Sequence, residues 1–172
     1  MEAAALVRQA RKGDKEALIQ LVMDQKNEYY RLAYTYTGNR EDSLDALQDM
    51  IVILFDNIRK LKDDSAFYSW SKTILVNRCR TMLRKSGRIV SLDDRSEEPY
   101  QENYTVRETR QDIQVCLNRL NNGQQEAIKL KYIMDMDYET IARLTGTPVG
   151  TVKSRVFNGL ARLKELLGGE EV

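Results

Sequence analysis

The sequence has no histidine, only two cysteines and only two prolines among its 172 residues. Without histidine the usual zinc ligand sets are missing, and Cys79 and Cys116 alone give no disulfide framework. Scarce proline, with 42% hydrophobic and 31% charged residues, favours a helix-rich globular fold over disorder. We therefore expect no metal site, no cofactor, and two cysteines that act as buried apolar side chains.

Long apolar runs are also missing. The N-terminus, Met-Glu-Ala-Ala-Ala-Leu, runs into charged residues and has no apolar core of a secretion signal. No stretch is apolar over the length that a bilayer requires. No nucleophile paired with a base is recognisable, so no catalytic residues are assigned. We expect a cytoplasmic protein that is not embedded in a membrane and is not an enzyme.

The net charge is only +1, although lysine and arginine supply most non-specific affinity for nucleic acid. The charges are nevertheless segregated along the chain. Segments 41–64 and 91–112 each carry seven acidic and three basic residues, whereas 66–90 and 148–164 carry six and four basic residues and no acidic one. This pattern indicates separate partners for separate segments.

Helical spacing of apolar residues is clearest between residues 44 and 61. It predicts a helix whose core face is formed by Leu44, Leu47, Ile51, Leu54, Ile58 and Leu61. On another side Asp45, Asp49 and Asp56 share a stripe, with Gln48 beside the first two. From the residues alone, this acidic stripe is either a solvated face or a binding surface. Shorter patterns predict helices around 17–22 and 29–36, the second ending near Gly38.

Another helix is predicted from Phe67 to about Lys85. Turn and cap chemistry precedes it at residues 63–65, and Phe67 is expected to fill the core. Its polar stripe consists of Asn77, Arg80, Arg84 and Arg88. Because aromatic rings stack on unpaired bases and arginines follow phosphates, this helix suits single-stranded DNA, although Trp70 suits a core equally well.

Periodicity fails between residues 87 and 107, where the chain is polar, acidic and interrupted by Pro99. We predict a first domain over 1–88, a linker over 89–109 and a second domain over 110–170. The linker is either a tether or an acidic strand that mimics nucleic acid in a basic channel. The expected fold is all-α, with two small helical domains joined by a flexible acidic linker.

The most specific stretch of the sequence predicts a helix-turn-helix after Asp137, which is expected to cap the first helix. Gly146 permits a positive φ in the turn. On the first helix Ala142 is small enough for the two helices to approach, and on the second helix Val152 packs against the first. Thr147 is expected to cap the second helix, with Pro148 at its first position. The inward stripe is predicted to be Val149, Val152, Val156, Leu160, Leu163 and Leu167.

The outer face of the second helix is suited to the major groove of DNA, where polar side chains reach base edges and phosphates. It carries Thr151, Ser154, Arg155, Asn158 and Arg162, with Lys153 beside them.

Over nearly its whole length the chain resembles an extracytoplasmic-function sigma factor, the smallest class of bacterial sigma factor. Residues 42–49, Asp-Ser-Leu-Asp-Ala-Leu-Gln-Asp, are similar to the family segment that docks on the clamp helices of the polymerase beta-prime subunit. Residues 64–70, followed by Ile74 and Asn77, are similar to the segment that opens and reads the minus-ten element. Residues 151–155, Thr-Val-Lys-Ser-Arg, match the helix that reads the minus-thirty-five element.

The resemblance implies three sets of binding residues. Polymerase docking is implied for Asp45, Gln48 and Asp49. The loop 62–65 is implied to hold a flipped base, so that the minus-ten set is Lys62, Asp63, Asp64, Ser65, Tyr68, Trp70, Asn77, Arg80, Arg84 and Arg88. The minus-thirty-five set is Thr151, Lys153, Ser154, Arg155, Asn158 and Arg162.

The resemblance further implies a monomer that binds core RNA polymerase, through beta-prime and beta, and directs promoter-specific initiation at stress-response genes. An anti-sigma factor, often membrane-anchored, is implied to cover both surfaces and to hold the protein at the inner face of the membrane. A low net charge fits this function, since weak DNA affinity leaves the free protein unsequestered. The alternatives are a dimeric helix-turn-helix regulator that acts without polymerase, a nucleic-acid enzyme, and a helical adaptor that binds only protein.

Overall fold

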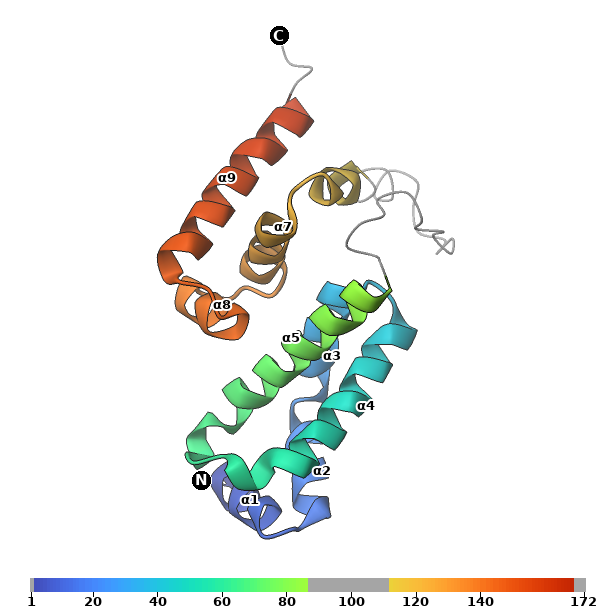
Figure 1. Ribbon diagram of the computed structural model, residues 1–172, viewed down its shortest axis with the longest axis vertical. Helices are drawn as coiled ribbons and strands as arrows, with labels where there is room; N and C mark the ends of the chain where they lie inside the picture. Colours follow the sequence, from blue (N-terminus) through green and yellow to red (C-terminus); the bar gives the residue numbers. More distant parts are fainter. Residues whose placement is uncertain (1, 87–111, 169–172) are drawn as a thin grey trace. The chain divides into compact units, whose positions relative to one another are not determined.

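The computed structural model describes residues 2–86 and 112–168, which contain helices and turns and no strand. The chain divides into two compact units, Met1–Lys85 with Arg143–Gly146, and Ser86–Ala142 with Thr147–Val172. The all-α expectation is confirmed for the described residues (Figure 1). The linker predicted over 89–109 lies outside them, and so does Arg88.

The first unit contains five α-helices and two short 3-10 turns: α1 (Glu2–Arg11), α2 (Lys15–Asp24), α3 (Lys26–Thr37), α4 (Arg40–Asn57), η1 (Ile58–Lys60), η2 (Asp64–Ala66) and α5 (Phe67–Lys85). Local signals define several ends. Asp14 caps α2 by accepting from the backbone N–H groups of Glu16 and Ala17, and Asn39 caps α4. The predicted end of α3 is confirmed, since Gly38 adopts a left-handed φ of 73° there.

Helices α3, α4 and α5 pack on one another, and α1 packs on α2. Phe67 is buried, as predicted, and so are Leu54, Ile58 and Leu61. The buried Tyr29 hydroxyl lies 2.7 Å from that of Ser71, so a polar group in this core has its hydrogen bond. Both cysteines are buried free thiols, which confirms their prediction as apolar side chains.

The predicted core face of α4 is wrong at its N-terminal end. Leu44 is 39% exposed, and the buried positions are Ser43, Ala46, Met50 and Leu54. Ser43 can be buried because its hydroxyl donates to the Asn39 carbonyl at 2.6 Å and lies 2.6 Å from the Thr37 hydroxyl. With its hydroxyl satisfied, Ser43 can face the core together with Ala46, in place of the predicted Leu44.

In the C-terminal part of the chain residues 112–118 are helical, and further helices follow: α7 (Asn122–Ile128), the π-helical turn η3 (Lys129–Ile133), α8 (Tyr138–Thr145) and α9 (Val149–Gly168). The prediction of a cap at Asp137 is confirmed, because its carboxylate accepts from the Thr140 N–H at 2.7 Å. The prediction for Gly146 is also confirmed, since its φ is +63°. Helix α9 begins at Val149, one residue later than predicted, and the Val152 backbone N–H donates a hydrogen bond to the Pro148 carbonyl.

The inward face of α9 follows the prediction at Val152, at Val156 and at Leu163, which packs against the buried cluster of Leu117, Leu120 and Ile128. It departs from the prediction at two other positions. Leu160 and Leu167 are 40% and 56% exposed, whereas Gly159 is buried. A Cβ atom on Gly159 would lie 2.5 Å from Cδ1 of Ile128 on α7, so glycine permits a close approach of the two helices. The predicted places of Leu160 and Leu167 in the core are therefore wrong, because the close contact is centred on Gly159.

Candidate nucleic-acid interface

The acidic stripe of α4 lies largely on the surface of the first unit. Asp45, Gln48 and Asp56 are exposed, whereas Asp49 is half-buried and forms an ion pair with Arg78 of α5, with 2.6 Å between Oδ2 and Nε. Exposed apolar side chains of the same helix lie among them at Leu44, Val52 and Phe55. A surface that mixes carboxylates with large apolar groups is typical of protein contacts more than of a solvated face.

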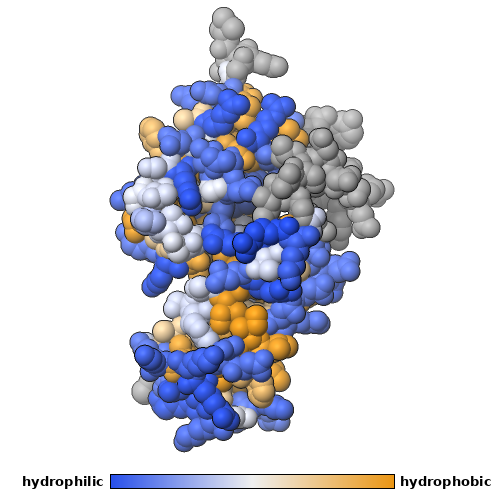
Figure 2. Space-filling view, in the orientation of Figure 1, coloured by the Kyte–Doolittle hydropathy of each residue, from blue (hydrophilic) through white to orange (hydrophobic). Residues whose placement is uncertain are grey.

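Apolar surface is visible among the hydrophilic residues of the first unit, in the lower part of Figure 2. Its α2 helix adds the exposed side chains of Ile19 and Met23. Neither residue is predicted from the sequence, although apolar side chains beside a charged stripe are the signal that could have identified them.

Helix α5 carries aromatic residues at its start and basic residues at its end. Phe67 is buried, and its ring makes edge contacts with those of Tyr68 and Trp70 at centroid distances of 5.4 and 6.2 Å. Tyr68 and Trp70 are partly exposed, so a face of each ring remains near the surface. Further along, Asn77 and Arg84 are exposed and Arg80 is partly buried.

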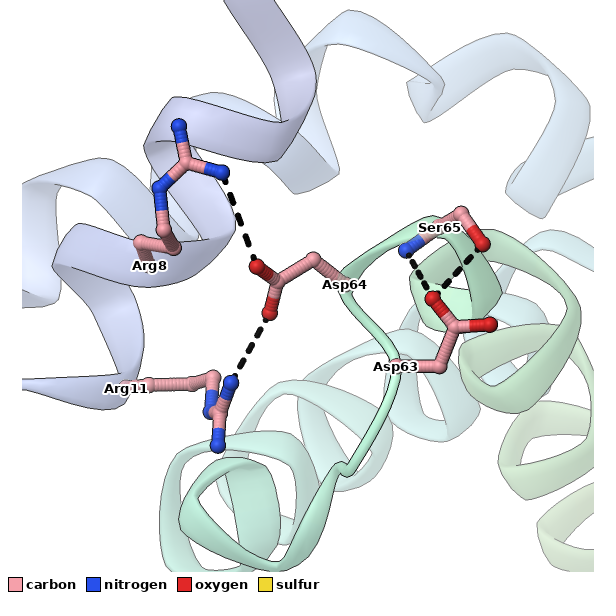
Figure 3. A network of polar contacts seen from close by, with 5 residues as sticks. All are labelled: Arg8, Arg11, Asp63, Asp64 and Ser65. Carbon is pink, nitrogen blue, oxygen red and sulfur yellow. Dashed lines mark hydrogen bonds and ion pairs between the residues drawn. The ribbon is translucent and has the colours of Figure 1, made fainter.

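The loop 62–65 joins η1 to α5 and is held at both ends by buried residues, Leu61 and Phe67. The Asp63 carboxylate accepts from the Ser65 backbone N–H at 2.9 Å and from the Ser65 hydroxyl at 2.7 Å. These hydrogen bonds lower the pKa of Asp63. Asp64 points the other way, toward α1 (Figure 3). The structure therefore presents Lys62, Asp63 and Ser65 to solvent and turns Asp64 inward.

In the C-terminal part of the chain α8, Gly146 and α9 form the helix-turn-helix, and most of the predicted reading residues are exposed: Thr151, Lys153, Ser154, Asn158 and Arg162. Arg155 differs, since it is half-buried and its Nη1 donates to the Thr147 hydroxyl at 3.4 Å. A Cβ atom on Gly123 would lie 2.9 Å from Nε of Arg155. The guanidinium is thus held between the turn and the start of α7.

Lys131 and Tyr138 lie beside the predicted Lys153, and neither of the two is predicted from the sequence. The Lys131 ammonium lies 4.5 Å from the centre of the Tyr138 ring, and the Lys153 ammonium lies 5.7 Å from it. Tyr138 therefore gathers two positive charges at the start of α8. From the sequence, Lys131 ahead of α8 is only a weak indication of DNA binding, because the fold alone brings it beside Lys153.

Within residues 2–86 and 112–168, no group of three acidic or cysteine side chains is placed to hold a metal ion. None of the described helices is both long and apolar enough to cross a membrane.

Two family models match the chain: Sigma-70 region 2 over residues 21–89, and Sigma-70, region 4 over residues 110–163. The ECF RNA polymerase sigma-E factor of Haemophilus influenzae is 31% identical over 169 residues, which cover 89% of this chain and 88% of that protein. The RNA polymerase sigma factor SigV of Bacillus subtilis is 28% identical over 158 residues, covering 92% and 95%.

Two solved structures have a similar fold. The sigma factor RpoE of Bartonella quintana, crystallised with the anti-sigma factor NepR, has a TM-score of 0.65 and 27% identity, and the match covers 88% of this chain and 97% of that one. CnrH, in complex with the cytosolic domain of CnrY, has a TM-score of 0.71 over 99% of this chain and all of that one. At 23% identity, this second likeness bears on the fold alone.

Proposed function

Because the chain belongs to the extracytoplasmic-function sigma factors, we propose that it binds core RNA polymerase and directs promoter-specific transcription initiation. The observation that carries this proposal is the pairing of a region 2 match over 21–89 with a region 4 match over 110–163 in one chain. A dimeric helix-turn-helix regulator is not favoured, since it accounts only for the second match. Sigma factors are in general not enzymes, and no covalent chemistry is proposed.

Polymerase docking is proposed for Asp45, Gln48 and Asp49, on the clamp helices of beta-prime. In support, the stripe is accessible on α4 and has large exposed apolar neighbours at Val52 and Phe55. Carboxylates steer the encounter with a basic partner, and the apolar groups add area removed from water. The beta subunit is a further proposed contact.

Minus-ten recognition is proposed for the loop 62–65 and α5, with a first domain over 1–88. The loop offers short polar side chains to a flipped base, and Tyr68 and Trp70 offer partly exposed rings for stacking. Asn77, Arg80, Arg84 and Arg88 are proposed to follow the strand, Arg88 from the sequence alone.

Minus-thirty-five recognition is proposed for the start and outer face of α9, in a second domain over 110–170 that follows a linker over 89–109. Arg155 is restrained beside Thr147, which suits a group that must meet one base edge. The exposed side chains of Thr151, Ser154 and Asn158 contact neighbouring bases or phosphates, with Lys153 and Arg162 on phosphates. Lys131 joins this set through its contact with Tyr138.

Control by an anti-sigma factor is also proposed. RpoE was crystallised with an anti-sigma factor, NepR, and the acidic and apolar surface of α4 offers such a partner a place to compete with polymerase. A cytoplasmic location, held at the inner membrane face by an anchored anti-sigma factor, and a role at stress-response genes are part of this proposal.

Run-off transcription with core polymerase on a randomised promoter library tests the function. The protein is expected to enrich one pair of elements at fixed spacing, and only when core polymerase is present. A gel shift in which the isolated protein binds duplex DNA tightly and specifically would favour a regulator that needs no polymerase. Unchanged promoter-directed transcription by Arg155→Ala would favour a protein-binding adaptor.

A further inference from the structure

Two arginines of α1 reach the loop that is proposed to hold the minus-ten base. Arg11 Nη1 donates to Asp64 Oδ1 at 2.9 Å, and Arg8 Nη1 lies 3.7 Å from Asp64 Oδ2. Each carboxylate oxygen therefore faces its own guanidinium (Figure 3). Helix α1 also contacts η1, which precedes the loop, and η2, which includes Asp64 and Ser65 of the loop. It lies ahead of residue 21, where the region 2 match begins.

The two adjacent carboxylates of the loop have different partners. Asp63 turns back on the loop itself and holds the backbone and hydroxyl of Ser65. Asp64 instead ties the loop to a separate helix, α1, through Arg11, which is 53 residues away from Asp64 in the sequence. The first carboxylate shapes the turn locally, whereas the second determines where the turn lies relative to the rest of the unit.

The ion pair has a second effect, which is electrostatic. An unpaired Asp64 would place a negative charge beside an incoming phosphate strand, and the two guanidinium groups neutralise it. The Arg11 and Asp64 side chains retain only 35% and 22% of their exposure, so water screens this pair less than a fully exposed one. The Arg8 side chain, at 59%, contributes less.

Together these contacts restrain the loop at three points. Leu61 and Phe67 anchor its ends in the core, and Asp64 anchors its middle to α1. The remaining side chains, those of Lys62, Asp63 and Ser65, are exposed. A loop that is ordered before DNA arrives loses less conformational freedom on binding and discriminates more sharply.

We propose that Arg11, assisted by Arg8, is a positioning residue for minus-ten recognition: through Asp64 it holds the loop 62–65 in the shape that receives an unpaired base. This inference rests on the proposed function of the loop. Neither arginine touches the base in this scheme, so the loss of either affects one step of promoter recognition and leaves polymerase binding intact.

The test uses the complete protein as holoenzyme on a promoter selected by the wild-type protein from a randomised library. Abasic sites are placed one at a time along the non-template strand of the minus-ten element, and the affinity of each template is measured. In the wild type, the abasic site at the position of the flipped base is expected to cause the largest loss of affinity. In Arg11→Ala that loss is expected to shrink roughly 3- to 10-fold, the range for one partly exposed charged hydrogen bond, with other positions unchanged.

Three variants sharpen the test. Asp64→Asn keeps the size of the side chain and removes its charge, and it should reproduce Arg11→Ala. The double variant should show no further change, because both substitutions remove the same interaction. Lys12→Ala removes a neighbouring exposed positive charge outside the contact and should behave as the wild type.

A uniform loss at every position, together with weaker core binding, would mean that the arginines only stabilise the fold, and would overturn the inference. An unchanged abasic profile in Arg11→Ala and Asp64→Asn, or additive effects in the double variant, would also overturn it. If the wild-type holoenzyme selects no promoter, the proposed function itself fails, and the inference fails with it.

Discussion

Gly159 offers the sharpest test of how the helix-turn-helix unit is packed, and the perturbation is Gly159→Ala. A Cβ atom there would lie 2.5 Å from Ile128 Cδ1, 3.3 Å from Gln124 Cβ and 3.4 Å from Ile128 Cγ1. The methyl end of isoleucine can move, but the Gln124 Cβ atom is fixed to the α7 backbone. The new methyl group therefore forces the two helices slightly apart or changes the rotamer of Ile128.

Two opposing terms determine the magnitude. Alanine favours a helix over glycine by about 1 kcal/mol, whereas overpacking a well-filled core costs about 1–3 kcal/mol. We expect a net loss of up to about 2 kcal/mol in the free energy of unfolding, which lowers the midpoint of a domain of this size by up to roughly 15 °C. Gly150→Ala is the matched control on the same helix, because a Cβ atom there has no neighbour within 4 Å. It should gain about 0.5–1 kcal/mol.

The assay is thermal and urea unfolding followed by far-UV circular dichroism, with the fluorescence of Trp70, the only tryptophan, reporting on the first unit. In an Ile128→Val background, which removes Cδ1, Gly159→Ala should become nearly neutral or stabilising. If Gly159→Ala stabilised the wild-type protein as much as Gly150→Ala does, the close contact of α7 and α9 at Gly159 would be refuted.

Other predictions concern the turn, the reading helix and the response to alkali. Gly146→Val should destabilise the helix-turn-helix by about 1–3 kcal/mol in the same assay, since a β-branched residue avoids a φ of +63°. Arg155→Ala should lower transcription from the selected promoter by roughly 10- to 100-fold and relax preference at one minus-thirty-five position, whereas Lys164→Ala on the same helix should not. Burial raises the pKa of Cys79 from 9.0 to about 12 and that of Tyr29 from 10.0 to about 12. The unfolded chain loses these protons first, so the contribution of the two groups to stability should be constant below about pH 9 and should be lost from there toward pH 12. Equal urea midpoints at about pH 8 and about pH 10.5 would contradict this.

Local chemistry explains which features the sequence could predict. The cap at Asp137, the left-handed glycines at positions 38 and 146 and the buried Val152 each depend on a few neighbouring residues. These signals are short-range, and they sufficed for the helix-turn-helix and for the end of α3. The family resemblance came from such stretches as well.

The errors lie where two helices meet. The sequence predicts Leu44 in the core, but Ser43, whose hydroxyl pairs with that of Thr37, is buried there instead. The sequence predicts Leu160 on the buried face of α9, but the close contact of Gly159 with Ile128 places Gly159 there instead. In both cases periodicity predicted a helix correctly and chose the wrong face, because apolar spacing alone does not contain the shape of the neighbouring helix.

By itself, the sequence determined the helical class and the helix-turn-helix, and it predicted the residues that we propose meet polymerase and DNA, because these depend on periodicity, capping and local charge. Only the tertiary structure decided which of those side chains are already occupied. It pairs Asp49 with Arg78, restrains Arg155 beside Thr147 and joins Asp64 to Arg11. Such pairs join residues whose distance in space depends on how the helices pack, and packing is a property of the whole unit rather than of any segment.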